Sequence, residues 1–181
     1  MQQAPDSSGN IRALLVYRNG QQLQRLNVCT NQPVPHTGKL GAVAFPDFNF
    51  DGYPDLALLV SSEHDNGSYC VWLFDPQAER FVFSEELSAL VNPAPDSEKK
   101  EVVSLKKNDC SGDCYERETY QWSESRLLPK SYVALNEDPA LVATENCRFV
   151  RTVKQEKDGR LREIQRQRVD VGGVPCEPHP F

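Results

Sequence analysis

Two turn-forming dipeptides, Asn19-Gly20 and Asp158-Gly159, each stand between two runs of strand-forming residues. Asn-Gly and Asp-Gly readily adopt the positive φ angles of a two-residue hairpin turn, so each predicts a pair of antiparallel strands. Elsewhere the apolar runs, such as residues 56–60, are strand-sized and bounded by turn residues. Residues 84–91 are the best short helix, with Ser84 as its N-cap. The sequence therefore predicts a mainly β protein, an antiparallel meander or sandwich with one short helix.

The length of 181 residues is sufficient for one buried core, so we expect a single domain over residues 1–181. Residues 1–10 are polar and are expected to be a flexible segment left after removal of an export signal. Residues 145–171 are expected to form a C-terminal β-hairpin whose exposed face is mostly Arg and Gln.

The net charge and the hydropathy pattern exclude two classes of partner. The formal net charge is -6, so attraction to the phosphates of a nucleic acid or to anionic lipid is not expected. No stretch approaches the roughly 20 consecutive apolar residues of a membrane-spanning helix. We therefore expect no nucleic-acid partner and no membrane-spanning segment.

Six cysteines, an even number, are spread along the chain without a CxxC motif. This spacing is typical of disulfides rather than of a zinc knuckle. Fifteen pairings exist for six oxidised cysteines. Reduced core cysteines in a cytosolic protein are the alternative, but disulfides favour an exported protein. Among the pairings we favour Cys29–Cys70, Cys110–Cys114 and Cys147–Cys176.

The stretch "DFNFDGYPDLAL", residues 47–58, places oxygen-bearing side chains at alternate positions around a glycine. Calcium is a hard cation that takes six to eight oxygen ligands, which one flexible loop can supply. Zinc or copper would require His or Cys, which the loop lacks. Gly52 permits the sharp turn that lets a backbone carbonyl point inward. The expected Ca²⁺ ligands are the side chains of Asp47, Asn49, Asp51 and Asp55 and the carbonyl of Tyr53.

This loop differs from an EF-hand, because its twelfth position is Leu58 rather than a bidentate Glu and its flanks resemble strands. The DxNxDGxxDL form resembles the calcium loops between strands in integrin-type and related bacterial repeats. A metal-free loop of Asx turns is the alternative. A calcium ion here is expected to be structural, since the loop offers no nucleophile or base beyond its own ligands.

Nothing in the sequence supports catalysis, and we expect that the protein is not an enzyme. The three histidines, His36, His64 and His179, lack any flanking motif that would position a catalytic base. Glu85 and Glu86 are adjacent on the expected helix, so their side chains point apart and do not form a glycosidase pair.

Three segments in this order resemble one bacterial family: "DFNFDGYPDLALL", "NGSYCVWLFDPQAERFVFSEELSAL" and "YERETYQWSESRLL". The family comprises periplasmic immunity proteins that block lysozyme-like effectors of antibacterial type IV secretion systems. These proteins are similar in fold to the periplasmic inhibitors of invertebrate-type lysozyme. The resemblance implies a β-rich domain with a calcium loop, no enzymatic activity, and a loop that plugs a glycan-cleaving active site.

In the lysozyme inhibitors the inhibitory loop carries a Ser-Gly-x-Tyr motif. The nearest match here is Ser111-Gly112-Asp113-Cys114-Tyr115, which has one residue more between Ser and Tyr. A serine hydroxyl and a tyrosine can hydrogen-bond the acidic pair of a glycosidase. A plain disulfide-closed turn is the alternative. A second candidate, Gly67-Ser68-Tyr69, has these residue types in a different order.

Two functions of different classes follow. The first is a periplasmic inhibitor of a lysozyme-like peptidoglycan hydrolase, which carries structural Ca²⁺ and inserts a loop into the active site. The second is a calcium-dependent glycan-binding or adhesion module of the cell surface. We expect a periplasmic location, and an outer-membrane lipoprotein with a lipid anchor on the native N-terminus fits the same interpretation.

Overall fold

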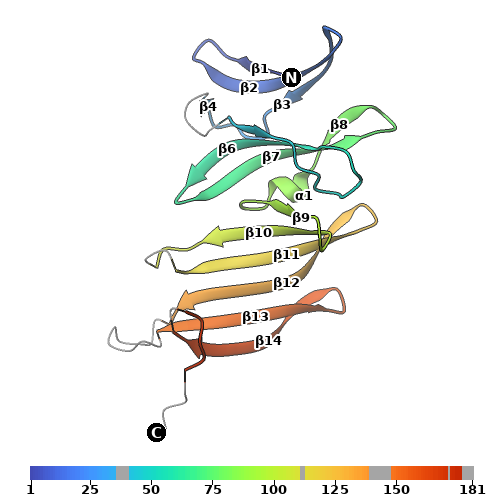
Figure 1. The fold of residues 1–181 in the computed structure, drawn as a ribbon. Helices are drawn as coiled ribbons and strands as arrows, with labels where there is room; N and C mark the ends of the chain where they lie inside the picture. The colour runs from blue at the N-terminus through green and yellow to red at the C-terminus, as the bar shows by residue number, and fades with distance from the viewer. Residues whose placement is uncertain (36–40, 111–112, 139–147, 171, 177–181) are drawn as a thin grey trace. The chain divides into compact units, whose positions relative to one another are not determined.

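The computed structural model describes residues 1–35, 41–110, 113–138, 148–170 and 172–176. Its chain divides into two compact units, Met1–Pro95 and Asp96–Phe181, and each is described by itself. Both consist of antiparallel strands (Figure 1), which confirms the predicted mainly β class. The expected single folding domain stays a prediction.

The first unit contains two antiparallel sheets. In the first sheet β2 is central, with β1 and β3 on either side and the short β4 also paired to β2. The second sheet follows chain order, β5-β6-β7-β8. The strands of the first sheet are β1 (Gln2–Pro5), β2 (Asn10–Arg18), β3 (Gln21–Asn27) and β4 (Val34–Pro35); those of the second are β5 (Val43–Ala44), β6 (Leu56–Glu63), β7 (Asn66–Asp75) and β8 (Arg80–Phe83).

One hydrophobic core serves both sheets of the first unit. The first sheet supplies Ile11 and Leu14, while the second supplies Leu56, Leu58 and Trp72. All of these side chains are almost completely buried. Burying such side chains contributes about 1.5–3 kcal/mol each relative to leaving them exposed. The apolar run of residues 56–60 forms part of this core, and its strand, β6, lies inside the second sheet.

The glutamine Gln24 links the edge of the first sheet to the edge of the second. Its Nε2 donates to the carbonyl of Phe81 at 2.7 Å, and the N–H of Phe81 donates to its Oε1 at 2.9 Å. The side-chain amide thus pairs with the β8 backbone as a neighbouring strand would. The exposed edge of β8 is thereby partly satisfied.

The helix α1 (Glu85–Ser88) is shorter than the eight residues expected. Ser84 is its N-cap, as predicted, and accepts from the N–H of Leu87 at 3.3 Å. The helix ends after one turn, and the chain then forms a β-bridge from Val91 to Ser68, followed by Asn92 with a positive φ of 47°. No helix in the described part of the chain is long and apolar enough to cross a membrane.

The second unit is a six-stranded antiparallel meander, ordered β14-β13-β12-β11-β10-β9. At one end of the sheet Leu135, Phe149 and Val169 pack with two cysteines in a small core. Away from this core, many side chains on both faces remain partly or fully exposed. The strands are β9 (Ala94–Asp96), β10 (Glu101–Lys107), β11 (Tyr115–Ser123), β12 (Arg126–Glu137), β13 (Phe149–Lys157) and β14 (Arg160–Val169).

Both predicted hairpin turns are present. Asn19 and Gly20 have φ angles of 51° and 80°, and Asp158 and Gly159 have 55° and 75°. These angles are those of the two central residues of a type I′ turn. The chain start differs from expectation: Gln2–Pro5 pair with β2, where a flexible segment was predicted. Pairing with a buried strand orders a polar segment that has little apolar content of its own.

Two of the three favoured disulfides are present, Cys29–Cys70 and Cys110–Cys114. Cys176 is also disulfide-bonded, and its expected partner, Cys147, lies outside the described residues. Cys29–Cys70 joins the segment that follows β3 to β7, where Cys70 belongs to the shared core. Because disulfides persist in oxidising compartments, these bonds favour an extracytoplasmic location.

The two disulfides should contribute unequally to stability. Cys29–Cys70 spans 41 residues, whereas Cys110–Cys114 spans 4. Loop-closure entropy gives about 4 kcal/mol for the first and about 2 kcal/mol for the second. We predict that Cys29→Ala with Cys70→Ala lowers the free energy of unfolding in urea by roughly twice as much as Cys110→Ala with Cys114→Ala. Equal losses would contradict the entropic ranking.

Candidate functional site

The aspartate loop, residues 47–55, joins β5 to β6 and folds back on its own backbone. The N–H of Asp51 lies 3.2 Å from Asp47 Oδ1 and 3.3 Å from Asn49 Oδ1. Gly52 donates to Asp47 Oδ2 at 3.0 Å and has a φ of 88°, which favours glycine. Asp51 Oδ1 in turn accepts from the N–H of Tyr53 at 2.8 Å. The side-chain oxygens of Asp47, Asn49 and Asp51 are therefore gathered around one tight turn.

Asp55 differs from the other aspartates because it is fully buried, with 0% exposure. Its Oδ2 accepts from the N–H of Phe48 at 2.7 Å, and its Oδ1 accepts from the N–H of Phe74 at 2.8 Å. Burial raises the pKa of Asp55 to about 6. The two hydrogen bonds lower this pKa, and the negative charges of Asp51 and Asp47 raise it further. The carboxylate therefore fastens the loop to strand β7.

The donor set of the loop suits calcium, since it consists of carboxylate, amide and carbonyl oxygens. Within the described residues, however, no three or more His, Cys, Asp or Glu side chains are grouped as a metal site. Asp55, expected to close the calcium shell, is already engaged by two backbone N–H groups. Its free lone pairs are still compatible with an ion. Calcium binding by this loop stays a prediction.

We predict that Asp55→Asn destabilises the protein even without metal. An amide has one acceptor oxygen, so one of the two buried N–H groups would face the new NH₂ and lose its partner. Leaving a buried donor unsatisfied costs about 1–3 kcal/mol. Urea unfolding in EDTA should show this loss.

Asp75→Asn is the matched control for this prediction. Asp75 Oδ1 alone accepts from both Gln77 and Ala78, at 2.9 Å and 3.1 Å, so the amide oxygen of asparagine can replace it. We expect less than about 0.5 kcal/mol of change, as for surface substitutions. A similar loss in both variants would contradict the role assigned to Asp55.

The first candidate inhibitory loop lies at the turn between β10 and β11. The Cys110–Cys114 disulfide closes it, and the N–H of Asn108 donates to the carbonyl of Cys114 at 3.0 Å. The side chain of Asn108 also donates to Glu116 at 3.0 Å and to Asn136 at 3.1 Å, which fixes the turn against β12. Ser111 and Gly112 lie outside the described residues. The described residues at the base of this loop are thus held by the disulfide and by the hydrogen bonds of Asn108.

Tyr115, the other predicted contact residue of this loop, begins β11. It is half-buried and packs against the small core that contains the disulfide. Its register pairs it with Lys107 on one side and Leu135 on the other. The ring of Tyr115 therefore contributes to packing, so a test of binding must remove its hydroxyl group and keep the ring.

The second candidate loop is the turn between β6 and β7, and the side chain of Asn92 clamps it. Asn92 Nδ2 donates to the carbonyl of Asp65 at 2.8 Å, and Gly67 donates to Asn92 Oδ1 at 2.8 Å. A Cβ on Gly67 would lie 2.9 Å from that same Oδ1, so only glycine fits there. Ser68 is exposed and Tyr69 is half-buried. The backbone of this turn is therefore held by hydrogen bonds from within the first unit.

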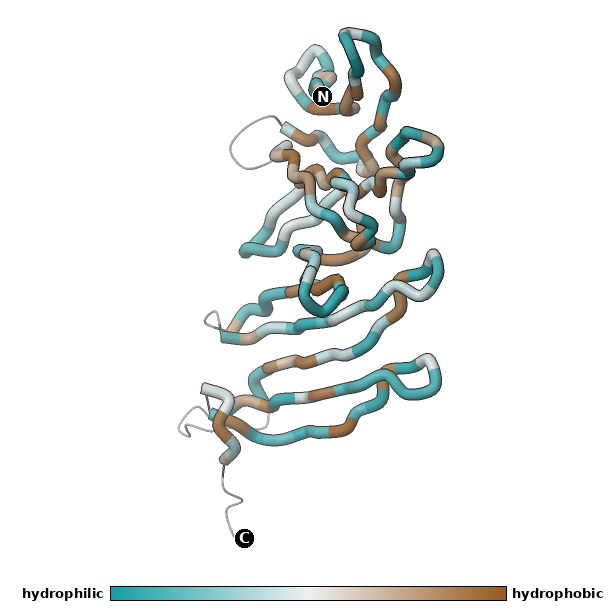
Figure 2. The backbone as a smooth tube through the Cα atoms, turned by 45° about the vertical axis from the view of Figure 1, so that its right-hand side comes forward, coloured by the Kyte–Doolittle hydropathy of each residue, from teal (hydrophilic) through white to brown (hydrophobic). Residues whose placement is uncertain are grey.

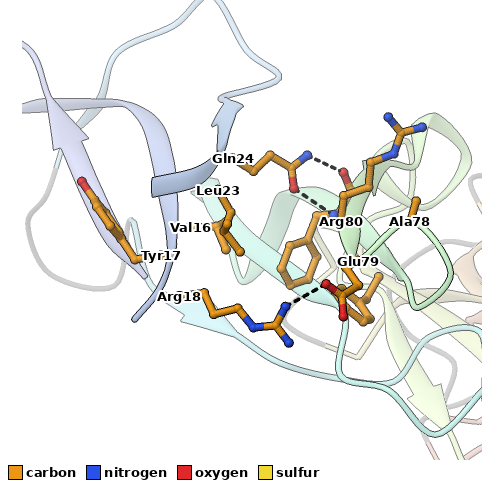
Figure 3. Close-up of a pocket in the computed structure, with 10 residues that line it drawn as sticks. Val16, Tyr17, Arg18, Leu23, Gln24, Ala78, Glu79 and Arg80 are labelled. Atoms are coloured by element: carbon orange, nitrogen blue, oxygen red, sulfur yellow. Dashed lines mark hydrogen bonds and ion pairs between the residues drawn. The ribbon is translucent and has the colours of Figure 1, made fainter. Parts of the chain in front are cut away.

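A groove of about 720 Å³ lies between the β2–β3 and β7–β8 hairpins of the first unit (Figure 3). Val16, Leu23 and Phe74 contribute to its lining, together with a 2.7 Å ion pair between Arg18 and Glu79. Of the three histidines, His64 is exposed at the tip of the β6–β7 turn and does not line the groove, whereas His36 and His179 lie outside the described residues. The sequence did not indicate this groove, because Gln24, which bridges it, is 57 residues from its partner.

Comparison with solved structures finds a similar fold in a protein described as a Xanthomonas type IV secretion system related protein. The two chains are 20% identical, and the match covers 91% of this chain and 85% of that chain with a TM-score of 0.59. At this identity the likeness shows a shared fold. No protein-family model matches this chain, and no curated protein matches it.

Proposed function

We propose that this chain is a periplasmic immunity protein that blocks a lysozyme-like peptidoglycan hydrolase by placing a loop in its active-site cleft. The similar fold in a type IV secretion system related protein supports this assignment, as do the disulfides, which fit an oxidising compartment. The observation that carries the proposal is the disulfide-closed turn between β10 and β11.

A covalently closed turn suits an inhibitory loop because the disulfide limits the separation of its two ends before binding. Ordering a flexible loop at an interface weakens binding, and a constraint that fixes the bound conformation in advance reduces this loss. Besides the disulfide, the N–H of Asp113 donates to the carbonyl of Cys110 at 3.2 Å. The loop is therefore restrained by both a covalent bond and hydrogen bonds.

The residue types of this loop match the chemistry of the proposed target. Glycoside hydrolases use two acidic residues, one of which is protonated, and hydroxyl groups can donate to or accept from either form. Ser111 and Tyr115 supply such hydroxyls. The exposed carboxylate of Asp113 would be repelled by that acidic pair, so we assign it to a basic group at the rim of the cleft.

A calcium ion in the aspartate loop would have a structural role in this protein. Asp47, Asn49, Asp51 and the carbonyl of Tyr53 would hold it, and Asp55 would transmit its effect to β7. The ion would neutralise clustered carboxylates that otherwise repel one another. It would not take part in inhibition directly.

We predict that the purified protein inhibits a cognate muramidase and that Ser111→Ala with Tyr115→Phe weakens inhibition at least about tenfold. Two hydrogen bonds to charged groups contribute about 1.5–3 kcal/mol each, which exceeds a tenfold change. Phenylalanine at 115 preserves the packing of the ring. The inhibition constant is measured by turbidity loss of a peptidoglycan suspension.

Ser68→Ala with Tyr69→Phe is the matched pair, at the start of β7 beside the β6–β7 turn, and we expect less than a twofold change for it. A reversed result would move the inhibitory site to residues 64–69. If neither pair alters inhibition, loop insertion by these residues is wrong. If the unaltered protein inhibits no muramidase, the proposed function itself fails.

We predict that calcium raises the melting temperature of the protein by about 5–10 °C at a hundredfold excess over Kd, since binding only to the folded state stabilises it. Asp51→Ala should abolish both the shift and the heat of binding in calorimetry. Asp75→Ala, which removes a half-buried carboxylate outside the loop, should leave both unchanged. An identical melting temperature in calcium and in EDTA would contradict the metal site.

A further inference from the structure

The β13–β14 hairpin has a charge opposite to that of the whole protein. Residues 148–170 contain eight Lys or Arg residues and four Asp or Glu residues, whereas the complete chain has a net charge of -6. Figure 2 shows this hairpin as mostly hydrophilic along both strands. A concentration of cations on one supersecondary element is a surface feature that the proposed inhibitory loop does not use.

The strand register sorts these side chains onto two faces. Paired residues of antiparallel strands point to the same side, and the pairs Arg151–Gln167, Gln155–Arg162 and Lys157–Arg160 share one face. The register shift beside Val153 keeps Gln165 on this face as well. A 2.8 Å hydrogen bond from Gln165 to Gln167 agrees with that placement. We call this surface the basic face: Arg151, Gln155, Lys157, Arg160, Arg162, Gln165 and Gln167.

The carboxylates of the two strands lie on the opposite face. There Glu163 pairs with Lys154, and Glu156 pairs with Leu161. On this opposite face Lys154 Nζ lies 4.8 Å from the ring centre of Tyr132, the residue of β12 with which Lys154 is paired. Within the described residues, none of the four cations of the basic face forms an ion pair. The basic face thus presents cations and amides without a carboxylate from β13 or β14; the register places Glu137 of β12 on the same side, where it pairs with Arg148 at 3.7 Å.

We propose that the basic face binds a carboxylate-bearing glycan chain. Arginine binds carboxylates through two parallel N–H···O bonds, and its charge persists at any physiological pH. The glutamine amides both donate and accept, which matches the hydroxyl and acetamido groups between the carboxylates of a glycan. Side chains two residues apart on a strand are about 6.7 Å apart, so the face offers a regular row of contacts.

A glycan fits this surface better than an acidic protein does. The cores of protein–protein interfaces are depleted of charge and enriched in aromatic residues and methionine, which supply most of the binding energy. The basic face contains neither; the apolar residues near it are Val153, which is half-buried, and Ile164 at the register irregularity, which is 58% exposed. A hydrated, flexible polyanion needs no apolar anchor. The proposal depends on neither the inhibitory activity nor calcium.

The test uses the complete protein in EDTA, with polygalacturonate as the carboxylated glycan and dextran as the neutral one. We expect binding to polygalacturonate at low salt, weaker binding at 150 mM salt, and no binding to dextran. Arg160→Gln with Arg162→Gln should weaken the binding at least about tenfold. Arg25→Gln with Arg126→Gln, which removes two exposed cations elsewhere, should change it less than twofold.

Several outcomes would overturn the proposal. Equal losses in both variant pairs would show that net charge, rather than this face, governs binding. Polyglutamate binding as tightly as polygalacturonate would assign the face to an acidic polypeptide. No binding of the unaltered protein to polygalacturonate would remove the glycan altogether. Circular dichroism of each variant confirms that the hairpin remains folded.

Discussion

The carboxylate of Asp55 is the interaction on which the arrangement of the first unit most depends. Its two oxygens accept from backbone N–H groups 7 and 19 residues away, one in the aspartate loop and one in strand β7. Asp55 is completely buried, and a hydrogen bond is electrostatically stronger in such surroundings than in water. Immediately after Asp55 begins the buried run of β6. One side chain therefore sets where the loop ends, where the interior strand begins and how β7 lies beside it.

The features that could be predicted from the sequence are those fixed by neighbouring residues. The two hairpin turns follow from the φ preferences of Asn-Gly and Asp-Gly, and the cap of α1 follows from a serine before two acidic residues. The turn at Gly52 follows likewise from the residue type, because its φ of 88° favours glycine. For the aspartate loop, sequence reasoning recognised the oxygen-bearing residues but treated Asp55 as equivalent to the others. Complete burial and a hydrogen bond from Phe74, which is distant in the sequence, distinguish it from them.

The features that sequence reasoning missed depend on contacts between distant segments. The pairing of Gln24 with the backbone of β8 has no sequence signature, because glutamine is common on strand surfaces and any register would look the same. The clamp of Asn92 on Gly67 is equally invisible, although an isolated glycine at a strand end hints at close approach. The two candidate loops consequently differ in one respect: both are held by hydrogen bonds, but the first is also closed by a disulfide, which requires an oxidising compartment.

The position of β14 at the end of its sheet has a consequence for solubility. An edge strand exposes unpaired N–H and C=O groups, to which another chain can add a strand and begin aggregation. The C-terminal end of β14 is partly covered, since Cys176 donates to the carbonyl of Arg168 at 3.1 Å. Along the remainder, Arg160, Arg162 and Arg166 would bring like charges together if a second copy approached, and the irregularity at Ile164 interrupts a continuous ladder. The arginines of this strand thus protect the open edge of a sheet that has little core of its own.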